Sequence, residues 1–441
     1  MIGFRFLLSF VFCFLHLFSN GQDFVMEDNA KKFSLNFQQI SNLVLIPLSI
    51  NGSQPLNFII DTGSPYTVIT NVEAIQYFNL NKGRPIQISG LGNDDKTLEA
   101  YLSMNNQIQI GKAVSKTTEL VLLYEENFNL SSRFGVPVYG IIGYDLLKEF
   151  LIEINYTRNK ISFYEPDYFY KKKKNKLKKF EEIPLQIKKK KPYIQVNSNL
   201  GNEYISLNLL IDSGSWDAMW LFEDESQKIH VPAQNIVDYL GFGLNGEIHG
   251  KKSRIPYVQL GSVKLELPTV SFPDTTSTQR VSRLDRNGAV GSEILKRFTT
   301  IYDYQNQKIF LKKNKQIHED FNYNMAGMEL YQPYPDLPYL EILYIRENSP
   351  AALAGLKKGD AVKFINGKKV GVFQSHLNED YRFSTNKLSK TESGGKKHEI
   401  ISLVEIIELF KKNEGERITI IYTRDGNEIQ HETSFVLEKS I

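Results

Sequence analysis

The chain of 441 residues contains the stretch LNFIIDTGS at positions 56–64 and a near copy, LNLLIDSGS, at positions 207–215. A second pair of matches follows at similar spacing. The glycine of IIG (141–143) comes 82 residues after the first aspartate, and the glycine of AVG (289–291) comes 79 residues after the second. Because ordered matches at nearly constant spacing indicate duplication, we interpret this part of the chain as two copies of a unit of roughly 130 residues.

The hydrophobic pattern of each copy predicts strands. In the first copy an apolar stretch at 43–50 leads into the turn signal NG at 51–52, and a second apolar stretch ends at the aspartate. Behind the two glycines, residues 144–150 and 292–298 have the spacing of short amphipathic helices. We predict a mainly β fold in which two tandem lobes form one bilobal unit, followed by a β-rich unit with helices.

The two aspartate loops favour acid/base chemistry. An apolar strand carries each carboxylate into the interior, and the glycine lets the backbone turn tightly. A pseudo-twofold relation between the copies brings Asp61 and Asp212 face to face, where two carboxylates share one proton. One carboxylate then acts as general base on a water while the other protonates a carbonyl oxygen. This chemistry requires no nucleophilic side chain, metal ion or cofactor.

Known families share these motifs. Residues 58–64 resemble the active-site loop of aspartic proteases, and residues 212–215 resemble its partner loop. Each copy resembles a retropepsin-like β-barrel lobe of the pepsin/retropepsin type. The stretch SPAALAGL at 349–356, with the GD and ING turns that follow it, resembles a bacterial PDZ domain, a β-sandwich with helices. The combination resembles the exported bacterial aspartyl proteases that carry a C-terminal PDZ domain.

The resemblance implies a role for each residue of the two loops. Asp61 and Asp212 are the implied catalytic pair. The implied supporting residues are Thr62, Gly63, Ser64, Ser213, Gly214 and Ser215. Thr62 and Ser213 are expected to cross-link the loops through their hydroxyls, and the serine after each glycine is expected to bond to the outer carboxylate oxygen. Since such a bond favours the charged form of a carboxyl, it predicts an acid-shifted rate optimum.

Two glycine-rich segments stand at matching places in the copies and are candidate mobile covers of the active site. The candidate cover residues are Gly90, Leu91, Gly92, Gly243 and Gly246. The alternative is that both segments are ordinary hairpin turns. Trp216 follows the second loop, where a small or apolar residue is more usual in the family. The sequence therefore does not define how much space a substrate has beside that loop.

The PDZ-like region implies peptide recognition by strand addition, with a terminal carboxylate held on backbone amides. The candidate carboxylate loop consists of Gly327, Met328, Glu329 and Leu330. This unit either binds peptides, terminal or internal, or only braces the protease lobes. The expected partners are therefore polypeptide substrates and a peptide ligand of the PDZ-like unit.

Charge is distributed unevenly along the chain. Lys and Arg number 53 against 50 Asp and Glu, a net of +3, but residues 171–191 hold eleven Lys and two Glu, a net of +9. The remaining chain therefore carries 3 − 9 = −6, which disfavours a nucleic-acid-binding protein. Residues 171–179 are predicted to belong to a solvated linker between the lobes, and residues 188–191 to form a charged, exposed hairpin turn. Attachment of this basic cluster to anionic lipid or acidic envelope polymer is the alternative.

The first residues have the features of a secretory signal peptide. Arg5 precedes an apolar run at 6–18, and small residues lie before the predicted cleavage at Gln22. A membrane anchor is the alternative, although the run is short for a bilayer span. Cys13 is the only cysteine of the chain, so a cleaved protein has no thiol for disulfides, catalysis or metal binding. We expect an exported protein, periplasmic or extracellular, with no membrane span after cleavage.

These inferences define the predicted organisation and function. The predicted segments are a signal peptide (1–21), an N-terminal lobe (30–167), a basic linker (168–180), a C-terminal lobe (181–314) and a PDZ-like domain (321–438). The predicted function is a monomeric aspartic endopeptidase. The alternatives are a non-catalytic peptide- or envelope-binding protein on the same scaffold, and a homodimer that pairs like lobes.

Overall fold

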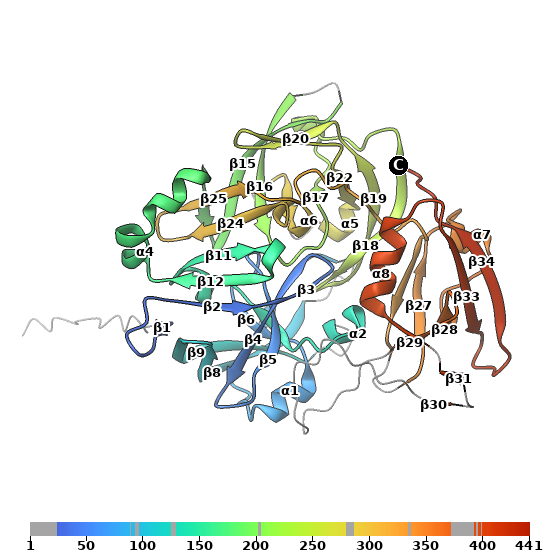
Figure 1. The fold of residues 1–441 in the computed structure, drawn as a ribbon, viewed down its shortest axis with the longest axis horizontal. Helices are drawn as coiled ribbons and strands as arrows, with labels where there is room; N and C mark the ends of the chain where they lie inside the picture. The colour runs from blue at the N-terminus through green and yellow to red at the C-terminus, as the bar shows by residue number, and fades with distance from the viewer. Residues whose placement is uncertain are drawn as a thin grey trace, which may run out of the picture.

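The structure is a computed structural model that describes residues 24–88, 90–92, 97–124, 129–201, 204–278, 286–333, 337–371, 392–393, 396–397 and 399–441. The predicted signal peptide, with Cys13, lies outside the described residues. Strands dominate the chain, so the predicted mainly β class is confirmed. Figure 1 shows two lobes that share a central sheet and a C-terminal unit packed at their side. Within the described ranges, no helix is long and apolar enough to span a bilayer.

The first lobe is built on one sheet that contains the first aspartate loop. Its strands are β1 (Val25–Met26), β3 (Gln38–Ile40), β4 (Leu43–Ile50), β5 (Leu56–Ile60), β6 (Thr67–Ile69), β7 (Arg84–Ile88), β8 (Leu98–Ile110), β9 (Ala113–Leu123) and β10 (Gly140–Ile142). The long strand β8 pairs with β4, β7 and β9, which bends the sheet round on itself. Helices α1 (Val72–Tyr77), α2 (Leu130–Phe134) and α3 (Tyr144–Leu147) connect its strands.

The second lobe repeats this arrangement. Its strands are β14 (Gln186–Lys188), β15 (Lys191–Asn199), β16 (Tyr204–Asp212), β17 (Met219–Leu221), β18 (Asn235–Gly243), β19 (Gly246–Arg254), β20 (Tyr257–Leu260), β21 (Val263–Glu266), β22 (Thr269–Pro273) and β23 (Gly288–Gly291). In both lobes the strand before the aspartate runs parallel to the strand of the second motif, β5 beside β10 and β16 beside β23. Short helices follow each motif, α3 in the first lobe and α6 (Ser292–Leu295) in the second; both begin where the pattern predicts them and end three residues earlier than predicted, shortly before the next strand. The duplication inferred from spacing is therefore a duplication of topology.

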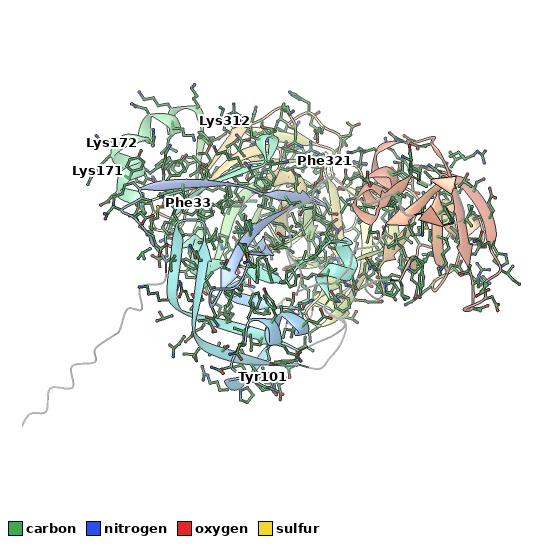
Figure 2. All side chains as sticks on the ribbon, turned by 60° about the horizontal axis from the view of Figure 1, so that its bottom comes forward. Phe33, Tyr101, Lys171, Lys172, Lys312 and Phe321 are labelled. Carbon is green, nitrogen blue, oxygen red and sulfur yellow. The ribbon has the colours of Figure 1, made fainter. Side chains whose placement is uncertain are left out.

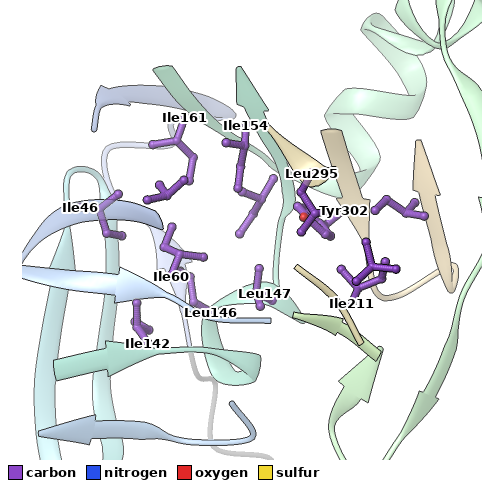
Figure 3. Close-up of a cluster of buried hydrophobic side chains, with 14 of the residues drawn as sticks. Ile46, Ile60, Ile142, Leu146, Leu147, Ile154, Ile161, Ile211, Leu295 and Tyr302 are labelled. Carbon is purple, nitrogen blue, oxygen red and sulfur yellow. The ribbon is translucent and has the colours of Figure 1, made fainter. Parts of the chain in front are cut away.

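A six-stranded sheet joins the two lobes. Its strands are β2 (Lys32–Asn36), β11 (Leu151–Asn155), β12 (Lys160–Tyr164), β13 (Glu181–Pro184), β24 (Phe298–Asp303) and β25 (Lys308–Lys313). The lobes meet where β11 pairs with β24 in antiparallel register. The buried side chains of this region form one continuous apolar cluster that runs from Ile46 and Ile60 in the first lobe to Ile211 and Leu295 in the second (Figure 3). Burial of this much apolar surface makes the lobes a single folding unit.

The predicted basic linker is more ordered than a solvated connector. Residues 166–179 form helix α4 (Pro166–Lys172) and a 3₁₀ segment, η3 (Lys174–Lys179). Phe169 is fully buried and packs on Leu151 and Phe310 of the shared sheet. Most of its lysines are exposed, and Lys171 and Lys172 lie at the outer edge of the molecule in Figure 2, whereas Lys176 is half-buried and pairs with Glu153. An aromatic side chain thus anchors the segment, which charge alone did not predict.

The C-terminal unit has its own sheet and core. Its strands are β26 (Met328–Tyr331), β27 (Leu340–Ile345), β28 (Ala361–Ile365), β29 (Lys368–Gly371), β32 (Ile400–Ser402), β33 (Arg417–Thr423) and β34 (His431–Val436). Helix α7 (Pro350–Leu353) is capped by Ser349, whose side chain accepts from the amide of Ala352, and helix α8 (Leu403–Lys412) is preceded by a capping box of Ser402 and Glu405. The pair β30 (Glu392–Ser393) and β31 (Lys396–Lys397) stands apart from this sheet.

Candidate active site

The two aspartate loops lie at the ends of equivalent strands and rest on equivalent supports. Strand β5 ends just before Asp61, and the amide of Asp61 donates to the carbonyl of Ile142 at 2.9 Å. Strand β16 ends at Asp212, which is paired with Gly291 of β23. Helix amides close the loops from below, since the amide of Ser292 donates to the carbonyl of Ser215 at 2.8 Å. The two hydrophobic-hydrophobic-glycine motifs thus lie beneath the loops.

Reciprocal hydrogen bonds link the two loops. The amide of Thr62 donates to Oγ of Ser213 at 3.0 Å, and the amide of Ser213 donates to Oγ1 of Thr62 at 2.9 Å. Each hydroxyl in turn donates to a carbonyl of the opposite strand, Thr62 to Ile211 at 2.6 Å and Ser213 to Ile60 at 2.8 Å. Both side chains are fully buried. Because every bond crosses between lobes, the cross-link holds the two aspartate loops in fixed relation.

The carboxylates of Asp61 and Asp212 converge on the glycines of the opposite loops. A Cβ atom added at Gly63 would lie 2.9 Å from Oδ1 of Asp212 and 3.1 Å from Oδ1 of Asp61. A Cβ atom at Gly214 would lie 2.6 Å from Oδ2 of Asp61. Each glycine amide also donates to the Oδ1 atom of its own aspartate, at 2.6 Å for Gly63 and 3.2 Å for Gly214. Glycine is therefore the residue that lets two carboxylates approach this closely.

The electrostatic setting favours one proton on the pair. Burial and the neighbouring Asp212 carboxylate raise the pKa of Asp61 to about 8, although the Gly63 amide and the Lys191 ammonium act against this rise. A carboxyl that keeps its proton at neutral pH can donate to a substrate oxygen, while its ionised partner accepts a proton from water. The arrangement can therefore perform general acid/base chemistry without a covalent intermediate.

The serine contacts differ from those expected. The hydroxyl of Ser64 donates to the carbonyl of Tyr66 at 2.8 Å, so it closes its own turn and does not bond to a carboxylate. The hydroxyl of Ser215 makes no hydrogen bond to another described residue. The expected acid shift of the rate optimum required those two bonds, and this arrangement lacks both. The pKa of Asp61 is raised, not lowered.

The two glycine-rich segments contact each other across the lobes. The amide of Gly90 donates to Oδ1 of Asn245 at 2.6 Å, and the amide of Asn245 donates to the carbonyl of Leu91 at 2.9 Å. Gly92 has a φ of +133° and lies directly on the Asn245 backbone, which explains the glycine there. Gly243 pairs with Gly246 at the tip of the β18–β19 hairpin, so this segment is a hairpin turn that also meets its counterpart.

Trp216 fills one side of the site. Its ring packs edge-on against Phe134 of helix α2, with ring centroids 5.8 Å apart, and joins the first-lobe cluster that contains Leu43 and Val138. Its carbonyl accepts a hydrogen bond from Nδ2 of Asn42 at 2.9 Å. The unusual residue after the second loop is therefore a contact between the lobes.

The candidate carboxylate loop lies against the protease lobes. Met328, Glu329 and Leu330 belong to strand β26, which is the edge of its sheet. The side chain of Glu329 accepts from Asn324, and burial with the nearby Asp238 raises the pKa of Glu329 to about 7. Gly327 forms the turn before the strand, and its carbonyl accepts from the amide of Arg346 at 2.8 Å. An acidic side chain in this position opposes binding of a terminal carboxylate.

Comparisons with known proteins support part of this interpretation. The family model described as Aspartyl protease matches residues 46–146, which include the first aspartate loop and most of helix α3. An aspartic proteinase from Irpex lacteus is similar in structure, with 11% sequence identity, a TM-score of 0.42, and coverage of 66% of this chain and 100% of that chain. No curated protein matches the chain. Residues 46–146 are therefore similar to aspartyl proteases.

Proposed function

We propose that this protein is an aspartic endopeptidase. Asp61 and Asp212 share one proton and bind a water between them. One carboxylate removes a proton from this water as it attacks the scissile carbonyl, and the other carboxyl donates its proton to the carbonyl oxygen. Collapse of the tetrahedral intermediate then breaks the C–N bond. The first carboxyl gives its proton to the leaving amine, and the second carboxylate takes a proton back from the hydroxyl that becomes the product carbonyl, which restores the pair with one shared proton.

One observation carries this proposal. The reciprocal hydrogen bonds between Thr62 and Ser213 hold two aspartates from duplicated loops side by side. A buried pair of acids costs stability, because the charged form loses hydration. Such a costly pair therefore favours a functional role. The family match to residues 46–146 supports the same function for the first loop.

Hydrolysis of a mixed peptide library, followed by mass spectrometry, tests the proposal. The wild-type protein should cleave internal peptide bonds, a pepstatin-type inhibitor should block cleavage, and Asp61→Asn should abolish it. Asp167→Asn is the matched control, because Asp167 is exposed on helix α4 far along the chain from both loops. Peptide binding without cleavage by the wild-type protein would instead support the non-catalytic scaffold.

We further propose that the PDZ-like unit braces the protease lobes. The amide of Gln332, just beyond edge strand β26, donates to the carbonyl of Ser132 in helix α2 at 2.9 Å. Leu403 of helix α8 lies against Gly135, so the helix beside β26 also faces the first lobe. Figure 1 shows α8 on the side of this unit that faces the lobes. A strand added to β26 would have to displace these contacts.

A buried ion pair fixes the same unit to the second lobe. Nη1 of Arg346 lies 3.2 Å from Oδ2 of Asp238, and the two side chains are 4% and 7% exposed. The rings of Tyr344 and Tyr239 pack beside this pair with centroids 5.7 Å apart. We propose on these contacts that bracing, rather than capture of a free terminus, is the role of the unit. Binding of C-terminal peptides to the full chain, measured by calorimetry, would contradict it.

We also propose export and a monomeric state. The apolar run at 6–18 motivates export, and N-terminal sequencing of the protein secreted by its native cell should begin at Gln22. The duplication places both aspartates in one chain, so one chain is sufficient for the site. Sedimentation equilibrium should give the mass of one chain, and a dimer whose dissociation removes activity would contradict this.

A further inference from the structure

Lys191 lies beside the catalytic pair. The hairpin β14–β15 turns at Lys189 and Lys190, which adopt φ values of +49° and +64°, and Lys191 is the first residue of β15. Strand β15 runs antiparallel to β16, and their ladder ends with Tyr193 opposite Leu210. Lys191 and Asp212 each lie two residues beyond this last pair, and the charges of both aspartates act on the pKa of Lys191. The sequence assigns this lysine to an exposed turn, whereas the structure makes it a partly buried neighbour of both aspartates.

Arg286 approaches the same place from the strand that supports the second loop. It precedes β23, and its guanidinium lies 5.4 Å from the ring centroid of Phe222. Atoms Nε and Nη1 are buried and have no hydrogen-bond partner among the described residues. Burial lowers the pKa of Arg286, and the nearby Asp212 partly restores it. These two nitrogens are strong donors that no acceptor among the described residues satisfies.

The first lobe has apolar residues at the two matching positions. Leu45 pairs with Ile59 as Tyr193 pairs with Leu210, so Leu43 corresponds to Lys191. Counting back five residues from each motif glycine makes Val138 the counterpart of Arg286. Leu43 and Val138 are each 1% exposed. The duplicated site is therefore apolar on one side and cationic on the other.

The residue after each aspartate loop reinforces this asymmetry. On the apolar side Trp216 packs into the first-lobe cluster. On the cationic side its counterpart is Pro65, and the ammonium of Lys190 lies 4.9 Å from the centroid of the neighbouring Tyr66 ring. The cationic side therefore has a proline where the apolar side has a tryptophan.

The charged groups of the site sum to a positive charge, which a bound anion would neutralise. A pair of aspartates that shares one proton carries −1, and Lys191 with Arg286 carries +2, which leaves a net charge of +1. The two cations also disfavour each other, since Arg286 contributes to a lowered pKa of Lys191 after burial itself. Within the described chain neither residue has an ion pair that would supply the missing charge.

We infer that Lys191 and Arg286 form a carboxylate-binding subsite next to the scissile bond, which makes peptides with an acidic group at that position the preferred substrates. The inference rests on the proposed endopeptidase function and adds its substrate class. Carboxylates are the natural ligands of paired Lys and Arg donors, and charge-assisted bonds of this kind are roughly twice as strong as neutral ones. The carboxylate comes from a Glu or Asp side chain or from the terminus of the substrate.

A matched set of quenched fluorogenic peptides tests this inference. Members differ only in Glu, Gln or Lys at each position flanking the cleaved bond, and each is made with an amidated and a free C-terminus. We expect a Glu peptide to have a kcat/KM about 10- to 100-fold above its Gln partner, the range of one charged hydrogen bond. Preference for the free acid with no Glu preference would assign the carboxylate to the terminus and still support the subsite.

Variants assign the preference to the two cations. Lys191→Met and Arg286→Met should reduce the Glu-to-Gln ratio toward one, while Lys189→Met, on the exposed turn of the same hairpin, should keep the wild-type ratio. Lys191→Gln and Arg286→Gln are measured as well. A variant whose circular dichroism spectrum shows misfolding is set aside, so that a folding defect does not decide the result. Equal loss for Glu and Gln peptides would mean that the cations act only on the aspartates, and it would overturn the inference.

A binding measurement separates failure of the inference from failure of the proposed function. Peptides in which the scissile amide is replaced by a reduced, non-cleavable bond are titrated calorimetrically. If the protein cleaves no peptide but binds the Glu analogue at least tenfold more tightly than the Gln analogue, the subsite stands and the enzyme assignment falls. If it cleaves peptides without regard to Glu, and binds both analogues equally, the subsite falls and the enzyme assignment stands.

Discussion

Thr62 and Ser213, 151 positions apart, each donate a backbone amide to the hydroxyl of the other, at 3.0 and 2.9 Å. Each hydroxyl donates a hydrogen bond to a carbonyl of the opposite lobe. Four hydrogen bonds in a fully buried setting thus depend on two side-chain oxygens. This relationship explains how two loops distant in sequence hold their aspartates together.

Removal of one hydroxyl should loosen the site. Ser213→Ala leaves the amide of Thr62 and the carbonyl of Ile60 buried without partners, which costs about 1–3 kcal/mol for each such group. We expect a lower free energy of unfolding in urea together with a lower kcat. Ser226→Ala, at an exposed turn, is the control. Unchanged stability and kcat in Ser213→Ala would show that the cross-link does not position the aspartates.

The pKa of Asp61 sets the alkaline limit of activity. The pair needs one proton, and Asp61 keeps it until the pH approaches about 8, so kcat/KM should fall as the pH rises through that value. The Lys191 ammonium lowers this pKa, so Lys191→Met should move the alkaline limb to higher pH. The profile is measured with an uncharged peptide, to keep the subsite out of the comparison. A limb that stays in place, or moves to lower pH, is incompatible with the assignment.

The same pKa predicts a dependence of stability on pH. The folded protein holds the Asp61 proton up to about pH 8, whereas the unfolded chain releases it near 3.8, so folded molecules bind more protons between these values. Stability from this group therefore falls as pH rises from about 4 to 8. Asp61→Asn should melt near the wild-type temperature at pH 4 and above it at pH 8. Parallel melting curves at the two pH values would contradict the raised pKa.

The ion pair between Arg346 and Asp238 should dominate attachment of the C-terminal unit. Arg346→Met leaves Asp238 buried without its counter-charge, a change that costs about 3–5 kcal/mol. Lys412→Met, which removes an exposed pair with Glu408, should cost less than about 1 kcal/mol. Limited proteolysis of the junction at 315–327 should accelerate only in the first variant. Addition of Asp238→Asn to Arg346→Met should recover part of the loss, and a full additive loss would argue against direct coupling.

Local pattern predicts the strands and loops of the lobes well. The duplicated motifs, the turn at Asn51 and the helices that begin at Tyr144 and Ser292 all follow from short-range chemistry, and the structure contains them. Contacts between distant segments do not follow from pattern. Burial of Phe169, for example, turns a lysine-rich connector into an anchored helix.

The site shows the same division. The carboxylate pair can be predicted from the two matching loops, because each loop contains a recognisable sequence motif. Lys191 and Arg286 carry none: one ends a run of four lysines, and the other lies five residues before a motif glycine. Only the folded chain brings both near Asp212, whose charge acts on the pKa of each. The bond from Ser64 to Tyr66 was likewise a choice among local partners that sequence does not decide.

The second aspartate is the most direct test of the central claim, because it lies outside the segment that matches the family model. The measurement is kcat/KM of Asp212→Asn on a peptide that the wild-type protein cleaves, with circular dichroism to verify the fold. The account predicts a loss of at least about 10²- to 10⁴-fold, the range of general acid/base catalysis. Cleavage at the wild-type rate by a correctly folded Asp212→Asn would contradict the two-carboxylate mechanism.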